Sequence, residues 1–264
     1  MIGVVACEAL YYAIERGDSS RCVEYVPQEL HEFPTSVPDE AGIRTALQAA
    51  IDKVDRPECE RIVVIYAADP ARNAVQSTHA PIAFAPIEDC VSAFLDGPVL
   101  EATGERKSPD TFYLTRGTIE CGVDAYKLYK AYTGEIPDLI ERFERAQVRY
   151  PDLRIRWPAG ERFSTAVERG RTQSTHGIER IFFDIVGSFE RVVLLDTGGT
   201  YDFHRDYAAS VREFIETLAT IHGNGHAVEL EVRQGDTTII DRALDNDELS
   251  RLETYGFAIK RPRN

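Results

Sequence analysis

Two hydrophobic patterns alternate along the first third of the chain. Short, continuous apolar runs rich in valine and isoleucine predict buried strands, and longer stretches with apolar residues three or four positions apart predict helices. The predicted strands are Ile2–Ala6, Cys22–Val26, Arg61–Tyr66 and Pro81–Pro86. The predicted helices are 8–16, Pro38–Val54 and one that begins over Asp89–Leu95. Continuous apolar strands separated by helices are typical of a parallel sheet that is covered on both faces.

The pattern weakens in the middle of the chain and then returns. Phe112–Thr115 predicts a strand, 123–148 predicts helix with an interruption near Gly134, and the polar, arginine-rich stretch 151–176 predicts irregular structure or a mobile lid. Later predicted elements are a strand at Arg191–Leu195, a long amphipathic helix that ends near Gly223, a strand at Ala227–Arg233, and a short strand or the start of a helix at Thr237–Leu244.

These elements predict an α/β fold: a doubly wound, mostly parallel sheet with helices on both faces, and an irregular or helical middle segment. We expect a single domain over residues 1–264. Its sub-halves would be about 1–96 and 180–264, joined by the middle segment 97–179.

Composition narrows the classes of partner. The chain is acidic, with a formal net charge of −14, so its summed field repels nucleic acid and anionic membrane surfaces. No apolar run approaches the roughly 18 residues of a membrane span. The first predicted strand begins at Ile2 without a preceding basic segment or cleavage site, so we expect a cytoplasmic protein.

The five cysteines are odd in number and widely spread: Cys7, Cys22, Cys59, Cys90 and Cys121. There is no CxxC pair, and a chain without an export signal keeps its thiols reduced. We therefore expect the thiols to serve packing, catalysis or metal binding. No P-loop, GxGxxG, GxSxG or HExxH motif is present, which argues against the best-known nucleotide-binding, hydrolase and metalloprotease classes.

A cysteine next to an acidic residue occurs at two places in the chain, each time where a predicted strand ends. Cys7 and Glu8 follow the first strand, and Asp89 and Cys90 follow PIAFAP. In open α/β sheets, ligands bind outside the carboxyl ends of the strands, and a helix N-terminus lowers the pKa of a thiol. The alternative is structural: a buried cysteine that closes a strand, and an aspartate that caps a helix.

Other polar residues follow the remaining strands. The residues predicted to line a ligand site are Asp69, Asn73, Arg116, Asp196 and Thr197. Arg116 would pair with an anionic group of a small ligand. The LLDTGGT stretch, which begins at Leu194, looks like a fragment of an aspartic protease, but no second copy exists and a long helix follows. It therefore predicts either an anion-binding turn or a tight turn that requires glycine.

The chain resembles a prokaryotic family, the domain of unknown function 1638. The resemblance is carried by IGVVACEAL, YVPQELHEFP, RIVVIY, IEDCVSAFL, FYLTRGTIE and RVVLLDTG. It implies a cytoplasmic α/β protein that accompanies corrinoid-dependent methyltransferase systems. Family members carry a cysteine after the third strand, near the position of Asp69, and a histidine where this chain has Glu88. The resemblance therefore implies that a cysteine and histidine centre has lost part of its ligands here, and Cys121 is a candidate replacement thiol.

We expect a small-molecule or metal-cofactor site linked to corrinoid or one-carbon metabolism. The predicted catalytic residues are Cys7, Cys90 and Glu8, as nucleophile or ligand and general base. A divalent metal is the candidate cofactor, and its predicted ligands are Cys7, Cys90, Asp89 and Glu88. The expected partner is a small molecule, with a second copy of the chain or a protein of a corrinoid system as further candidates. The alternatives are a non-catalytic accessory or regulatory protein, and a divergent homologue with an eroded site.

Overall fold

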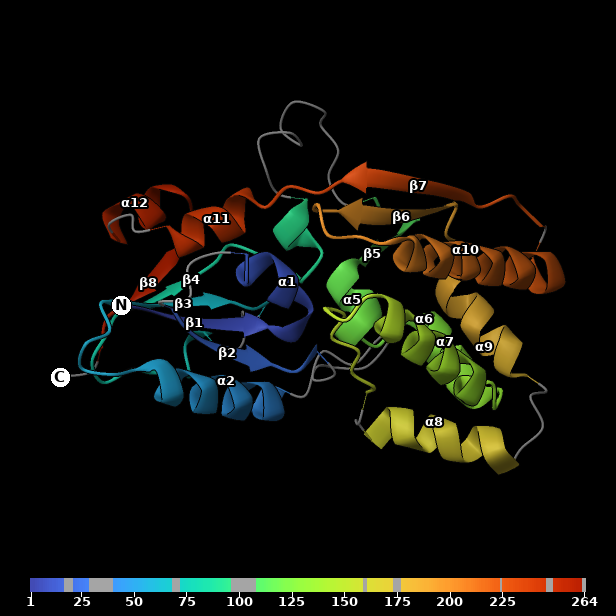
Figure 1. The fold of residues 1–264 in the computed structure, drawn as a ribbon, viewed down its shortest axis with the longest axis horizontal. Helices are drawn as coiled ribbons and strands as arrows, with labels where there is room; N and C mark the ends of the chain where they lie inside the picture. Colours follow the sequence, from blue (N-terminus) through green and yellow to red (C-terminus); the bar gives the residue numbers. More distant parts are fainter. Residues whose placement is uncertain are drawn as a thin grey trace. The chain divides into compact units, whose positions relative to one another are not determined.

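A computed structural model describes most of the chain. The described residues are 1–16, 21–28, 40–67, 72–95, 108–158, 161–172, 177–223, 225–245 and 249–262. They form two compact units (Figure 1). Unit 1 contains the described residues of 1–95 and 235–262, and unit 2 contains those of 108–234. Because unit 1 is made of two chain segments, unit 2 is an insertion between them.

Unit 1 is built on a five-stranded sheet with the order β2-β1-β3-β4-β8. The strands are β1 (Ile2–Cys7), β2 (Cys22–Val26), β3 (Arg61–Ile65), β4 (Ile82–Phe84) and β8 (Ala258–Lys260). The first four are parallel, and β8 runs antiparallel to β4. All residues of β1 and β3 are buried, as expected for central strands covered on both faces. The carboxyl ends of four strands therefore lie at one edge of this sheet.

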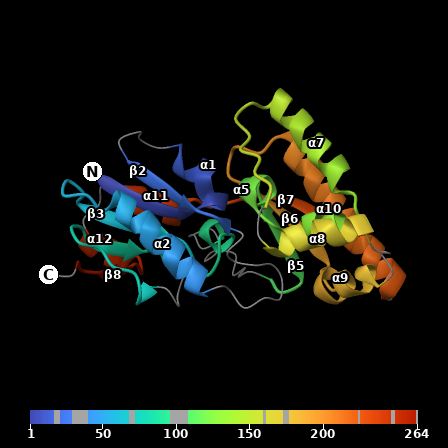
Figure 2. The ribbon, with the colours of Figure 1, turned by 90° about the horizontal axis from the view of Figure 1, so that it is seen from below.

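Helices cover both faces of this sheet. The helical elements of unit 1 are η1 (Glu8–Leu10), α1 (Tyr11–Ile14), α2 (Glu40–Val54), η3 (Ser92–Phe94), α11 (Thr238–Leu244) and α12 (Leu249–Thr254). Helix α2 lies over β1 and β2 on one face, and α1 and α11 lie on the other (Figures 1 and 2). The apolar positions of α2 recur at helical spacing, from Ile43 through Leu47 to Val54, and all three are buried.

Unit 2 has a three-stranded parallel sheet with the order β5-β6-β7. Its strands are β5 (Thr111–Thr115), β6 (Arg191–Asp196) and β7 (Glu229–Gln234). Its helices are α5 (Arg116–Cys121), α6 (Ala125–Tyr132), α7 (Ile136–Arg149), α8 (Glu161–Thr172), α9 (Ile178–Val186) and α10 (Asp202–His222). The edge strand β5 is mostly buried, whereas β7 is largely exposed.

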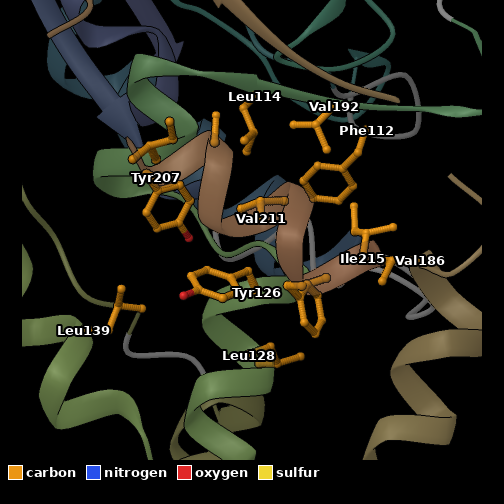
Figure 3. Close-up of a cluster of buried hydrophobic side chains, with 14 of the residues drawn as sticks. Phe112, Leu114, Tyr126, Leu128, Leu139, Val186, Val192, Tyr207, Val211 and Ile215 are labelled. Atoms are coloured by element: carbon orange, nitrogen blue, oxygen red, sulfur yellow. The ribbon is translucent and has the colours of Figure 1, made fainter. Parts of the chain in front are cut away.

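One continuous core holds unit 2 together. Side chains of α10 lie between those of the strands and those of α6, with α7 and α9 completing the cluster (Figure 3). Phe143 of α7 is fully buried and meets the rings of Phe203 and Tyr207 edge to face, at centroid distances of 4.9 and 5.7 Å. Such aromatic pairs contribute beyond their buried area, so this cluster stabilises the unit strongly.

The structure confirms the predicted α/β class with mostly parallel strands flanked by helices. Strand β2 has the predicted bounds, and the other predicted strands of both units are found within one or two residues of their ends. The helix over 123–148 is interrupted near Gly134, as predicted, and forms α6 and α7. The strands form two sheets, however, and the local patterns did not predict this division.

Three predicted elements differ from the structure. The stretch 151–176, predicted to be irregular, contains helix α8. The helix predicted over 8–16 is a 3₁₀ turn followed by one short helix, and the helix predicted to begin at Asp89 is only the 3₁₀ turn η3. Thr237–Leu244, predicted as a short strand or the start of a helix, forms helix α11, so the second alternative is confirmed. The polar sequence of α8 does not indicate how closely this helix packs. A Cβ built on Gly170 would lie 2.1 Å from the Ala131 carbonyl oxygen, so only glycine permits this close approach to α6.

Candidate functional site

The carboxyl ends of β1, β3 and β4 bring two thiols and a phenol together in unit 1. Cys7 ends β1, Tyr66 directly follows β3, and Cys90 lies in the turn after β4. Ala6 is paired with Ile65, so the next position in the same register places Cys7 beside Tyr66. Residues in register on neighbouring strands project to the same face of a sheet. We call Cys7, Tyr66 and Cys90 the thiol–phenol cluster.

The side chain of Tyr66 interacts electrostatically with both thiols. Its side chain is buried, and its hydroxyl group lies 3.4 Å from the carbonyl oxygen of Pro27, which follows β2. Burial raises the pKa of Tyr66 far above its usual value, and negative charge on Cys7 and on Cys90 raises that pKa further. Each sulfur therefore lies within electrostatic range of the same hydroxyl group. Tyr66 was not among the predicted site residues, although it ends the RIVVIY run at the predicted edge.

The pKa of Tyr66 predicts a loss of stability in alkaline solution. The unfolded chain releases this proton near pH 10, well before the folded chain does. The stabilising contribution is therefore complete below about pH 10 and is lost as the pH rises above it. We expect Tyr66→Phe to reduce the fall in unfolding free energy between about pH 9 and pH 11, measured by urea unfolding with far-UV circular dichroism. Tyr255→Phe, at a half-buried site in the same unit, should retain the wild-type slope.

Glu8 and Asp89 accompany the thiols, but their surroundings differ. Glu8 is half-buried and begins η1. Because η1 and α1 are short, they offer only a small dipole to Cys7. The Asp89 carboxylate accepts hydrogen bonds from the backbone N–H groups of Val91 and Ser92, at 3.0 and 2.7 Å. Asp89 thus caps its own turn, which was the structural alternative for this residue.

Of the other predicted residues of unit 1, two are exposed and one is not among the described residues. Glu88 is exposed. Asn73 is also exposed, and its backbone carbonyl accepts a hydrogen bond from Lys260 at 2.8 Å. Asp69 lies outside the described residues. Among the residues that the structure describes, no group of three or more histidine, cysteine, aspartate or glutamate side chains is arranged to hold a metal ion.

Arg116, predicted to bind an anionic ligand, belongs to unit 2 and is surrounded by protein groups. Its Nε donates to Glu120 at 2.7 Å, its Nη1 to the Gly199 carbonyl at 2.8 Å, and its Nη2 to the Asp152 carboxylate at 3.1 Å. Its guanidinium also lies over the ring of Tyr201. The structure therefore gives Arg116 a role in holding unit 2 together.

The LLDTGGT stretch forms a tight turn at the end of β6. The Asp196 carboxylate accepts a hydrogen bond from the Gly198 N–H at 2.7 Å, and Gly198 has a φ of 83°, which favours glycine. Burial alone would raise the pKa of Asp196, but the nearby Thr200 side chain and hydrogen bonds from the turn backbone lower it below its usual value. Thr197 is buried. The predicted alternative of a glycine-requiring turn therefore describes this segment.

A buried polar network lies beneath Arg116. Glu120 and His204 are fully buried, and their side chains meet at 2.9 Å. His204 Nδ1 accepts a hydrogen bond from the Tyr201 N–H at 2.9 Å, so Nε2 carries the proton that is donated to Glu120. The second Glu120 oxygen accepts from the Arg154 N–H at 2.7 Å. Both ring nitrogens of His204 are thus engaged in structural hydrogen bonds, and His204 was not predicted from the sequence.

Lys127 is a fully buried cation in the same unit. Its ammonium group donates to the carbonyl oxygens of Ile119 and Gly122, at 2.6 and 2.7 Å, and thereby closes the carboxyl end of α5. The rings of Phe143, Trp157 and Tyr207 surround it at centroid distances of 5.3 to 6.0 Å. Burial lowers the pKa of Lys127. This burial could not be predicted from the local sequence, in which Lys127 looks like an ordinary surface lysine.

The remaining thiols and a cavity lie elsewhere. Cys121 belongs to unit 2, where its Sγ lies 3.2 Å from the carbonyl oxygen of Arg154. Cys59 lies at the amino end of β3, opposite the thiol–phenol cluster, and burial raises its pKa. A cavity of 370 Å³ in unit 1 is lined by Ala13, Arg16, Arg21, Thr237, Asp241, Leu244 and Asp245. Arg21 precedes β2, so this cavity lies towards the amino edge of the sheet and does not include the predicted residues.

Comparison with known proteins places the chain in a family. No curated protein and no solved structure matches it. In the described part of the chain, no helix is long and apolar enough to cross a membrane. The model of a family described as protein of unknown function, DUF1638, matches residues 25–244. The match includes Tyr66 and Cys90 but begins after Cys7. Because it covers more than half of the 264 residues, the chain belongs to the DUF1638 family.

Proposed function

We propose that unit 1 binds a small molecule or a metal cofactor through its thiol–phenol cluster. The observation that carries the proposal is the strand register: it places Cys7, at the end of β1, beside Tyr66 after β3, and Cys90 follows the neighbouring strand β4. They lie at the carboxyl edge of a parallel sheet, which is the edge where α/β proteins bind ligands. We further propose that the ligand belongs to corrinoid or one-carbon metabolism and that the protein acts in the cytoplasm.

The chemistry of the cluster favours a soft or electrophilic partner. Thiolates are nucleophiles and bind soft metals such as Cu(I) and Zn(II). The raised pKa of Tyr66 keeps its phenol neutral beside the sulfurs, and its hydroxyl group lies 3.4 Å from the carbonyl oxygen of Pro27. A closed structural zinc site needs four protein ligands, and the described residues do not supply them here. The donor set instead fits a centre with two sulfur ligands whose other positions are filled by the small molecule or water.

Binding of a thiophilic ion tests this proposal. Anaerobically purified full-length protein is titrated with Cd²⁺, and thiolate-to-metal absorption is followed together with equilibrium dialysis. We expect one tightly bound ion per chain. Cys7→Ser and Cys90→Ser should each weaken binding by more than about 10- to 100-fold, the loss caused by removing an outer-shell partner.

Cys59→Ser provides the matched control. Cys59 and Cys90 are each 7% exposed, but Cys59 lies at the opposite end of the strands. Its replacement should leave Cd²⁺ binding unchanged. If the Cys7 and Cys90 variants bind the ion as tightly as the wild type, or if the wild type binds none, a two-thiol site is excluded. Unit 1 would then be assigned a structural or accessory role.

A further inference from the structure

Strand β7 has the features of a pairing edge. In the part of the chain that the structure describes, β7 is hydrogen-bonded only to β6. Leu230 and Val232 project to the same face as Val192 and Leu194, their register partners in the buried core. Yet Leu230 is 38% exposed and Val232 is 44% exposed. The apolar face of the sheet thus extends to its edge, and such edges readily pair with another strand.

The ladder with β6 determines which backbone groups of β7 point outward. The N–H of Glu229 donates to the carbonyl oxygen of Glu190 at 3.0 Å, on the β6 side. Backbone groups of successive strand residues point to alternate edges. The backbone N–H and C=O groups therefore point towards β6 in Glu229, Glu231 and Arg233. They point to the open edge in Leu230 and Val232.

Two side chains of opposite charge flank Val232 in β7. Glu231 precedes Val232 and Arg233 follows it, and both project to the sheet face opposite Val232. Their charges are already matched within the strand, where Arg233 Nε and Nη2 donate to the two Glu231 oxygens at 3.0 Å each. Hydrogen bonding by Arg233 lowers the pKa of Glu231, so the carboxylate is charged at neutral pH.

We propose that β7 pairs antiparallel with β7 of a second copy of this chain, about a two-fold axis at Val232. The two Val232 residues then face each other as a hydrogen-bonded pair through their outward backbone groups. Glu231 of each copy lies opposite Arg233 of the other, in the closer, non-hydrogen-bonded type of pair. The two three-stranded sheets become one continuous sheet of six strands, and the exposed Leu230 and Val232 side chains extend a shared apolar face.

The neighbouring registers are disfavoured. A shift by one residue would align outward backbone groups with inward ones and lose the hydrogen bonds. A shift by two residues would place Glu231 opposite Glu231 in one direction and Arg233 opposite Arg233 in the other. Like charges directly opposite each other destabilise a strand pair. Only the register centred on Val232 satisfies both the backbone and the charges.

The charges on β7 also have an alternative explanation. Monomeric proteins place charged residues on edge strands to prevent association. Repulsion of that kind needs charges that clash when the strand meets its own copy. The Glu231–Arg233 arrangement is instead complementary to itself, so the second copy is the partner that it fits.

A charge exchange tests the proposed dimer. Sedimentation of the full chain should show a wild-type dimer. Glu231→Arg places two like-charged pairs in the interface and should raise the dimer dissociation constant about tenfold or more. The double variant Glu231→Arg, Arg233→Glu restores opposite charges and should recover the dimer. Glu229→Arg is the control, because residue 229 would lie opposite Gly235 in this register.

Val232→Pro distinguishes pairing from misfolding. Its N–H faces the open edge, so proline removes no hydrogen bond to β6 and is tolerated as in other edge strands. This variant should be monomeric and still give the native emission of Trp157. A wild-type chain that sediments as a monomer at every concentration overturns the proposal. So does a double charge exchange that is no more dimeric than Glu231→Arg alone.

Discussion

Replacement of Glu120 by alanine is expected to lower the unfolding free energy of unit 2 by about 3–5 kcal/mol, the cost of leaving a buried charge without its partner. The fully buried carboxylate accepts hydrogen bonds from Arg116, His204 and the Arg154 backbone. Asp152 stays beside Arg116, but it is more than half exposed and bonds a different nitrogen. The variant would therefore bury part of a guanidinium and an imidazole N–H without an acceptor.

Unfolding of unit 2 can be followed specifically. Trp157 is the single tryptophan of the chain, it belongs to unit 2, and it contacts the ring of Phe143 at a centroid distance of 5.1 Å. Urea unfolding monitored by tryptophan fluorescence therefore measures this unit. Glu141→Ala is the matched control, because Glu141 is also paired with an arginine four residues away but is exposed. It should cost no more than about 0.5 kcal/mol, and an equal loss in both variants would contradict the role given to Glu120.

Replacement of Lys127 by alanine is expected to cost about 3–5 kcal/mol in the same assay. The change removes the donor to the carbonyls of Ile119 and Gly122, and it empties the space between the rings of Phe143 and Tyr207. Buried carbonyl groups that lose their hydrogen bonds are costly, and so is the remaining cavity.

Lys127→Met separates these two effects. Methionine fills most of the space of the lysine stem, so it leaves little cavity. It carries no charge, so both the cost of burying an ammonium group and the hydrogen bonds of that group are removed. We expect it to be clearly more stable than Lys127→Ala. Lys130→Ala, in the same helix at a half-exposed site paired with Glu135, should cost less than about 1 kcal/mol. If Lys127→Ala were as mild as Lys130→Ala, the ammonium group would not be closing α5.

The strands of this protein could be predicted because their sequence signal is local. RIVVIY and RVVLL are continuous apolar runs, and such runs form buried parallel strands. The assignment of strands to two sheets depends on contacts between distant residues, which no local pattern contains. Strand β8, with the short sequence AIK, was missed for the same reason: it is defined by pairing with β4.

Helix α8 shows a second limit of sequence patterns. Its predicted irregularity followed from a polar composition, but Phe163 and Ala166 are buried. Their burial, together with the close contact at Gly170, is enough to hold the helix against α6. Tertiary packing, rather than helical propensity, determines such a helix.

The candidate site could be predicted in part. The rule that ligands bind at the carboxyl ends of parallel strands selected Cys7 and Cys90, and both lie near Tyr66. The same rule also selected Arg116, which is bound by protein groups instead. One of them, Asp152, is 36 residues away in the sequence. His204 is 84 residues from Glu120. Buried ion networks are assembled from such distant residues, so spacing along the chain does not predict them.

The insertion of unit 2 within unit 1 has a consequence for synthesis on the ribosome. Residues 108–234 are contiguous, so unit 2 can fold as soon as they emerge. Unit 1 must wait, because β8 and α11 come from the last segment, and the Lys260 ammonium group donates to three carbonyls, those of Arg72, Asn73 and Val75. During translation, the sheet beside Cys7 and Cys90 therefore lacks β8 until the inserted unit has been made. Nascent chains arrested at a length at which residue 234 has left the ribosome but β8 has not should be protected from protease in unit 2 first.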